Sequence, residues 1–103
     1  MMVKTKKQKS KKLSSKGKLL FRAKIHVALK KSVFDPQGKT VLDALHSLGF
    51  QETVKLRVGK FFDLELQARN QKEAQLRVKT MCEKLLINPV IEEYSFDIES
   101  VWK

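Results

Sequence analysis

The sequence predicts an α+β protein of the ferredoxin-like type, in which a four-stranded antiparallel sheet carries two helices on one face. Segments with alternating apolar and polar residues, the pattern of half-buried strands, occur four times. Segments with helical spacing occur twice, and the order is strand, helix, strand, strand, helix, strand. With right-handed crossovers, this βαββαβ order gives a sandwich with the spatial strand order 4-1-3-2.

The first half of the fold begins with a strand at residues 21–30, where the odd-numbered positions are apolar. The turn DPQG follows. Asp35 can accept backbone hydrogen bonds and Pro36 fixes φ, so this turn is expected to start a helix. The apolar positions of that helix recur at helical spacing, and Gly49 is suited to end it: Val41, Ala44, Leu45 and Leu48.

The second half is predicted to be a hairpin, a helix and a last strand. Residues 54–58 and 62–66 alternate as strands, with Gly59-Lys60 as a tight connection between them. Asn70 and Glu73 resemble a capping box at the start of a helix, which Asn88-Pro89 ends. The last strand has these inward positions: Tyr94, Phe96 and Ile98.

Charges on the outer face of the sheet support the predicted strand order. Across the order 4-1-3-2 their signs alternate from strand to strand: Glu93, Asp97 and Glu99; Arg22, Lys24 and His26; Asp63 and Glu65; Lys55 and Arg57. Opposite charges on neighbouring strands contribute about 0.2–1 kcal/mol per pair, and like charges would cost a similar amount. Such a mixed-charge face is also suited to packing on a second copy in a two-fold dimer.

The net charge of +11 is concentrated at one end of the 103 residues. The first 18 residues hold eight lysines and no acid, and they have too few apolar groups to offset the entropy of ordering them. We therefore predict a basic, disordered tail over residues 1–20 and a single folded domain over residues 21–103. A domain this small gains stability from oligomerisation.

The residue inventory argues against catalysis, metal binding and membrane insertion. Cys82 is the only cysteine and lies on an apolar helical stripe, which is typical of a buried thiol. Neither His26 nor His46 has a carboxylate or a nucleophile at a committed spacing. No apolar run approaches the ~20 residues of a membrane span, and no signal sequence is present. We expect a soluble, cytoplasmic protein without catalytic, cofactor-binding or metal residues of its own.

The residues disagree with a P-loop and with an RNA-recognition module. Gly38-Lys39-Thr40 resembles the end of a P-loop, but Val33 stands where the first glycine is required. The strand-3 pattern of RNA-recognition modules matches only Gly59 and Phe62, and the outer face nearby is acidic. A small nucleic-acid-binding module that uses the Lys-rich tail stays as the alternative function.

Three stretches together resemble the PurS-type small subunit of bacterial phosphoribosylformylglycinamidine synthase. They are KIHVALKKSVFDPQGKTVLDALHSLGF, LRVGKFFDLEL and MCEKLLINPVIEEY, in the family's order. The resemblance covers about residues 21–100 and not the tail. It implies a non-catalytic subunit, a homodimer or tetramer, that bridges an ATP-dependent synthetase subunit and a glutaminase subunit. The complex converts formylglycinamide ribonucleotide to formylglycinamidine ribonucleotide in purine biosynthesis, and ATP, Mg and glutamine would be used by the partner subunits.

By transfer from the matching motifs, seven residues are predicted to serve the assembly: Asp35, Pro36, Gly38, Arg57, Gly59, Lys60 and Trp102. The glycines and the proline have an equally good explanation in backbone geometry alone. Arg57 suits bidentate interface contacts, although a cross-strand pair with Asp63 or Glu65 competes. Trp102 follows the last strand, where it is either an interface anchor or a lightly packed end.

Overall fold

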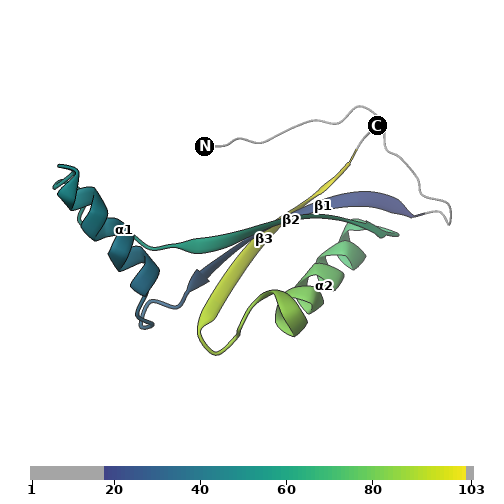
Figure 1. The fold of residues 1–103 in the computed structure, drawn as a ribbon. Coiled ribbons are helices and arrows are strands. Elements are labelled where there is room, and N and C mark those ends of the chain that lie inside the picture. Colours follow the sequence, from purple (N-terminus) through teal and green to yellow (C-terminus); the bar gives the residue numbers. More distant parts are fainter. Residues whose placement is uncertain (1–17, 102–103) are drawn as a thin grey trace.

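The computed structural model describes residues 18–101, which form one antiparallel sheet with two helices. The elements are β1 (Leu19–Leu29), α1 (Pro36–Ser47), β2 (Gly59–Ala68), α2 (Gln71–Met81) with a π-helical turn at Cys82–Leu86, and β3 (Glu92–Ser100). The sheet has the order β2-β1-β3, and α2 covers one of its faces (Figure 1). The α+β class is therefore confirmed, and so are the neighbours predicted for the first strand.

The strand register confirms the predicted inner and outer faces. In the central strand β1, the side chains of Phe21, Ala23, Ile25 and Val27 are buried, because alternation turns them toward α2. They pack against Val78, Cys82 and Ala74 of the helix side. On the outer face, Arg22 stands between Glu65 and Glu99, and Lys24 stands between Asp63 and Asp97.

Helix α2 starts at the predicted cap. The side chain of Asn70 accepts a hydrogen bond from the backbone N–H of Glu73 at 2.8 Å, and the carboxylate of Glu73 accepts one from the N–H of Arg69 at 2.6 Å. The helix then changes to the π-helical turn, where the N–H of Ile87 donates to the carbonyl of Cys82 at 3.0 Å. The helical run therefore ends at Leu86, two residues before the predicted stop at Asn88.

Helix α1 does not lie where the sequence predicts it. Within residues 18–101 it packs on no helix or strand over any substantial area, and it lies beyond one end of the sheet (Figure 1). Gly38 is its only buried residue. The prediction of two helices on one face is thus wrong for the single chain, since α2 alone covers that face.

The predicted hairpin between residues 54–58 and 62–66 also does not form within the chain. The described residues contain three strands, and β2 begins at Gly59, where a turn was expected. Residues 53–58 have no regular structure and lead from α1 into β2. The alternation of this segment is real, but alternation reports only which residues share a face and not which strand they pair with.

The limits of the predicted domain agree only broadly with the structure. Strand β1 begins at Leu19, inside the segment predicted as tail. The disorder predicted for the tail and the role predicted for Trp102 concern residues 1–17 and 102–103, which lie outside the described residues. No helix within residues 18–101 is long and apolar enough to cross a membrane.

Candidate functional site

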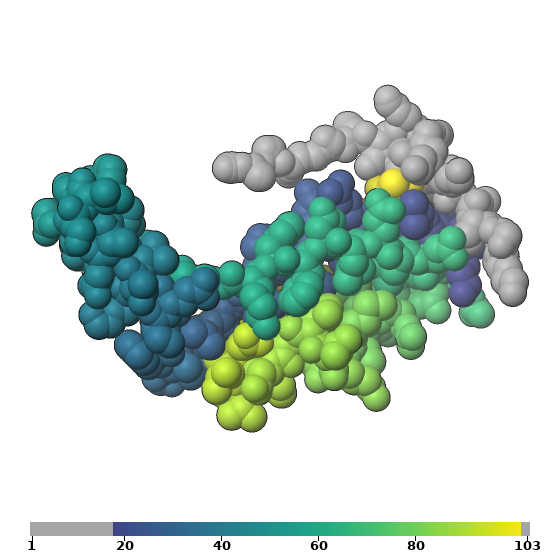
Figure 2. Space-filling model, viewed as in Figure 1, coloured from purple at the N-terminus to yellow at the C-terminus, as the bar shows by residue number. Residues whose placement is uncertain are grey.

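Residues 30–58, called the arm below, carry α1 away from the end of the sheet (Figure 2). The base of the arm is the point where it leaves β1 and returns to β2. Ala28 and Gly59 face each other there in the strand register, so the two chain segments leave the sheet side by side. The contacts at this base decide the direction of the arm, and they involve most of the residues predicted to serve assembly.

The carboxylate of Asp35 joins the two segments at the base. One oxygen accepts a hydrogen bond from the N–H of Gly38 at 2.9 Å and caps α1. The other accepts one from the N–H of Val58 at 2.8 Å, just before β2. The bonds from Val58 and Gly38 hold the pKa of Asp35 below its usual range, because they favour the ionised form. Pro36 is the first residue of α1, where its fixed φ suits the helix.

Arg57 forms a second connection across the base. Its guanidinium Nη2 donates to the carbonyl oxygens of Lys30 and Val33, each at 3.0 Å. These are carbonyls of the outgoing segment, so Arg57 holds that segment against the returning one. The competing cross-strand pairs predicted for Arg57 do not form. Instead, Arg22 makes a two-pronged contact with Asp63, with Nε to Oδ1 at 2.9 Å and Nη2 to Oδ2 at 2.6 Å.

Two glycines allow the close packing of the base. A Cβ on Gly38 would lie 2.3 Å from the carboxylate oxygen of Asp35 and 3.0 Å from the carbonyl oxygen of Leu56. A Cβ on Gly59 would lie 2.5 Å from the carbonyl oxygen of Val27. A side chain at Gly59 would push the two strands apart there, and a side chain at Gly38 would displace the carboxylate that joins the two segments. Close approach therefore explains both glycines, as the backbone interpretation expected.

Lys60 belongs to the same end of the sheet. Its ammonium lies 3.1 Å from the carboxylate of Glu92 on β3, and the pair spans the inner face above Val27. A hydrogen bond from the N–H of Asn88, together with Lys60, keeps the pKa of Glu92 below its usual range. A recess of about 270 Å³ lies between this pair and the arm; its lining includes Asp35, Gln37 and Leu29.

The outer end of the arm is also held in one shape. Helix α1 ends in a Schellman motif: Gly49 has φ of 102°, its N–H donates to His46, and the N–H of Phe50 donates to Leu45. The imidazole Nε2 of His46 lies 2.7 Å from the carbonyl oxygen of Thr53 and ties the returning segment to the helix. His46 is thus a structural residue of the arm.

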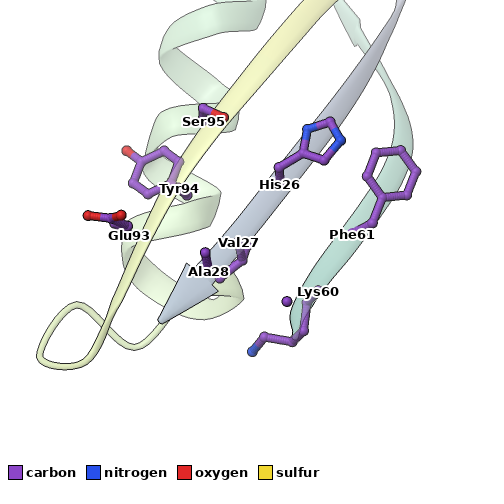
Figure 3. A pocket seen from close by; sticks show the side chains of 9 residues that line it. His26, Val27, Ala28, Lys60, Phe61, Glu93, Tyr94 and Ser95 are labelled. Carbon is purple, nitrogen blue, oxygen red and sulfur yellow. The ribbon is translucent and has the colours of Figure 1, made fainter. Parts of the chain in front are cut away.

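The outer face of the sheet has a shallow recess near the base of the arm. It has a volume of about 490 Å³, and its lining includes His26, Phe61, Glu93 and Ser95 (Figure 3). The rings of His26 and Phe61 are 4.9 Å apart between their centroids, on neighbouring strands. The small residues Ala28 and Gly59 also line this recess. Cations and carboxylates alternate along the rest of the face, so it suits a protein surface of mixed charge.

The geometry disagrees with both nucleotide-binding interpretations. In the P-loop interpretation the N–H of Gly38 would bind phosphate, but it donates to the carboxylate of Asp35 instead. A phosphate at this place would be repelled by that charge. In the RNA-recognition interpretation, Phe62 would stack a base, but it belongs to the inner face and packs on the core. Phe61 is exposed, and the next outward residue on its strand is acidic.

Few of the described side chains are placed to act as reactive or metal-binding groups. Cys82 is fully buried, and burial raises the pKa of its thiol, which agrees with the predicted packing role. Among residues 18–101, no group of three or more His, Cys, Asp or Glu side chains could hold a metal ion.

Six of the seven predicted residues meet at the base of the arm, and Trp102 lies outside the described residues. Sequence reasoning missed their partners: the carbonyls of Lys30 and Val33, the N–H of Val58 and the carboxylate of Glu92. No sequence pattern predicts a hydrogen bond between a guanidinium and a backbone carbonyl far away in the chain. Whether these six residues contact another subunit stays a prediction.

Comparisons with known proteins identify the family. Residues 22–100 match the family model described as PurS, phosphoribosylformylglycinamidine (FGAM) synthase. The PurS subunit of this synthase from Bacillus subtilis is 43% identical over 82 residues, which are 80% of this chain and 96% of the relative. The PurS subunit from Archaeoglobus fulgidus is 42% identical over 81 residues, which are 79% of this chain and 96% of the relative.

Solved structures agree with these relatives. The crystal structure of Methanocaldococcus jannaschii PurS has a TM-score of 0.72 at 34% identity, covering 79% of this chain and 98% of that one. A chain of the PurLQS structure from Thermotoga maritima has a TM-score of 0.70 at 39% identity, covering 80% and 98%. Sequence, fold and extent of the match agree, and the chain belongs to the PurS family of phosphoribosylformylglycinamidine synthase subunits.

Proposed function

We propose that the chain is the non-catalytic assembly subunit of a phosphoribosylformylglycinamidine synthase in purine biosynthesis. It holds an ATP-dependent synthetase subunit next to a glutaminase subunit, so that ammonia from glutamine reaches the synthetase without loss. The reaction converts formylglycinamide ribonucleotide to formylglycinamidine ribonucleotide in the cytoplasm. ATP, Mg and glutamine are used by the partner subunits, and this chain binds none of them.

One observation carries the proposal: the likeness to a chain of the Thermotoga maritima PurLQS structure, whose name places PurS together with two other subunits. The surfaces of this chain are consistent with such a role. The arm presents a capped helix away from the body, and the outer sheet face presents alternating charges. The comparisons give no support to the alternative of a nucleic-acid-binding module.

The proposal includes self-association. A homodimer, or a tetramer built from two dimers, would cover the apolar side chains that the arm exposes in the single chain. These include Phe34, Leu48 and Val54, which are exposed to 68%, 73% and 86%. Large apolar side chains exposed together on one segment favour an interaction site there.

The test is reconstitution from the separate subunits. The synthetase and the glutaminase are assayed with glutamine, and then with ammonium salt, in the presence and absence of this chain. We expect glutamine-driven turnover to require the chain, while ammonia-driven turnover persists without it. Co-purification of both partners with the tagged chain would support the same conclusion. Equal glutamine-driven turnover without the chain would overturn the proposed function.

A further inference from the structure

The outer face of the sheet, opposite α2, is acidic although the chain as a whole is basic. The outward side chains of β1, β2 and β3 form this face, and no helix of the described residues packs on it over a substantial area. Its charged side chains are five carboxylates and two cations: Asp63, Glu65, Glu93, Asp97 and Glu99, with Arg22 and Lys24. The net charge of +11 therefore comes from other parts of the chain.

Most of these carboxylates have no ion pair within residues 18–101. Arg22 binds Asp63, and the other ion pairs of the described residues join Lys39 to Asp43 and Lys60 to Glu92. Four carboxylates of the outer face take part in none of them: Glu65, Glu93, Asp97 and Glu99. The first three are exposed and the last is half-buried. The face can therefore accept further cations.

The helix side of the molecule has the opposite charge. Four cations and two carboxylates belong to α2 and its π-helical turn: Lys72, Arg77, Lys79 and Lys84, with Glu73 and Glu83. A lysine-rich segment is repelled from a surface with an excess of cations and attracted to one with an excess of carboxylates. Of the two sides of the sheet, the outer face is the one that suits such a segment.

Residues 1–17, which lie outside the described residues, are a lysine-rich segment of this chain. They hold seven lysines and no acidic residue. They lead into β1, which is the central strand, so they are attached between the two strands that carry the carboxylates. A tether of this kind raises the effective concentration of the segment at a nearby site to the order of millimolar.

The length and the lysine spacing of this segment fit the outer face. When extended, 17 residues span at most about 55–60 Å, and the 11 residues of β1 are about 36 Å long. Every second side chain of an extended chain lies on the same side, as Lys7, Lys9 and Lys11 would. Asp97 and Glu99 follow the same spacing along β3.

We propose that residues 1–17 fold back along the outer face of their own sheet, where their lysines pair with Glu65, Glu93, Asp97 and Glu99. Each such pair is weak and screened by salt, so the contact depends on several pairs acting together and on the tether. A protein that docks on the outer face then has to displace the segment first. This inference goes beyond the proposed function and does not depend on it.

A first test joins lysines to the carboxylates that they touch. The full chain is treated with a carbodiimide, which links an ammonium to a carboxylate in contact, and the linked peptides are identified by mass spectrometry. We expect links from residues 1–17 to the four carboxylates at about 10 mM salt. They should be lost at about 1 M salt, because the screening length falls from about 30 Å to about 3 Å. Glu83, an exposed carboxylate on the helix side, is the internal control and should give no link.

Isotope labelling separates a contact within one chain from a contact between two copies. Chains labelled with ¹⁵N and unlabelled chains are mixed in urea, refolded together and cross-linked. The expected result is links between peptides that carry the same label. Links that join labelled to unlabelled peptides as often as chance allows would place the segment on a second copy and overturn the proposal.

A second test measures how fast trypsin cleaves within residues 1–17. The face variant combines three substitutions: Glu65→Gln, Glu93→Gln and Glu99→Gln. The control variant changes the net charge equally at exposed carboxylates away from the face: Asp43→Asn, Glu52→Gln and Glu83→Gln. At about 10 mM salt the face variant should be cleaved about threefold faster than the parent chain or more, because cleavage follows the population of the released segment. The control variant should be cleaved at the rate of the parent chain.

The outcomes decide the proposal. Links to the outer face at low salt, together with faster cleavage of the face variant alone, support it. Absence of these links, or links to Glu83 that are equally frequent, overturns it. Equal cleavage rates in the face and control variants overturn it as well. If the face variant does not fold, the cross-links of the parent chain give the answer.

Discussion

At the scale of single residues, Asp35 links the two segments of the arm where they meet the sheet. It caps α1 with one oxygen and binds the N–H of Val58 with the other, so one side chain joins the segment that leaves the sheet to the segment that returns. Gly38 leaves room for this carboxylate, since a Cβ there would overlap it. The short motif that resembles a phosphate loop is thus explained by an internal carboxylate.

Asp35→Asn should separate the two roles of this residue. Asparagine caps helices well, so α1 should persist. Its amide nitrogen would face the N–H of Val58, and two donors repel, so amide exchange at Val58 should accelerate by about tenfold. Hydrogen exchange followed by mass spectrometry or NMR measures this effect. Unchanged protection at Val58 would show that the bond is dispensable. Asp43→Asn is the control, because in the described part of the chain Asp43 pairs with the exposed Lys39.

Asp35 also predicts an effect of pH on the arm. Its folded pKa is lower than the unfolded value of about 3.9, so ionisation stabilises the folded base. This stabilisation is fully present above the unfolded pKa and is lost as the pH falls through the lower folded pKa. Protection at Val58 should therefore decline in that acid range in the parent chain. The decline should be smaller in Asp35→Asn, in which only the other carboxylates with a lowered pKa, such as Glu92, still titrate.

At the scale of elements, α2 shows how local signals and packing agree. The cap formed by Asn70 and Glu73 starts the helix, and its buried stripe of Ala74, Val78 and Cys82 covers the central strand. Helix α1 has equally good local signals, a proline at its first position and a Schellman motif at its end, but within residues 18–101 it covers no helix or strand over a substantial area. Local signals therefore determine where helices form and not what they cover.

Asn70→Ala should destabilise the folded chain by about 1 kcal/mol, because the backbone N–H of Glu73 loses its acceptor at the start of α2. Urea denaturation followed by circular dichroism should show a lower midpoint with an unchanged slope. Lys72→Ala, an exposed change in the first turn of the same helix, is the control. If both variants denature at the same midpoint, the cap makes no contribution.

At the scale of the whole molecule, charge is divided between a mixed-charge body and a basic segment outside the described residues. Seven of the eleven net positive charges belong to residues 1–17. The outer sheet face, in contrast, alternates cations and carboxylates, with Arg22 bound to Asp63. A surface in which each cation has an acidic neighbour attracts polyanions weakly.

Removal of residues 1–17 should therefore abolish any binding of single-stranded RNA by the chain. The fold and the number of chains per oligomer should stay unchanged. Fluorescence anisotropy over a series of salt concentrations measures the binding, and its salt slope should be steep for the full chain only. RNA binding of equal strength by the shortened chain would place a nucleic-acid surface on the body and revive the alternative function.

Much of the fold could be predicted because the informative signals are local. The alternation of β1, the cap at Asn70, the stop at Gly49 and the burial of Cys82 depend on periods of two or 3.6 residues and on turn chemistry. The outer-face charges could be placed because the register follows once β1 is central. Six candidate residues were selected from matching motifs. Those motifs did not predict that the six lie together at the base of the arm.

The sequence by itself determined the type of almost every element and, for the strands and α2, the face that each one buries, because these depend on neighbouring residues. Only the tertiary structure decided that residues 54–58 run straight into β2 instead of folding back, and that α1 points away from the sheet. The physical reason lies in bonds between residues far apart in the chain. Asp35 binds Val58 across 23 positions, and Arg57 binds the carbonyl of Lys30 across 27. Contacts of this separation have no period and no local pattern, so they become visible only when the chain is folded.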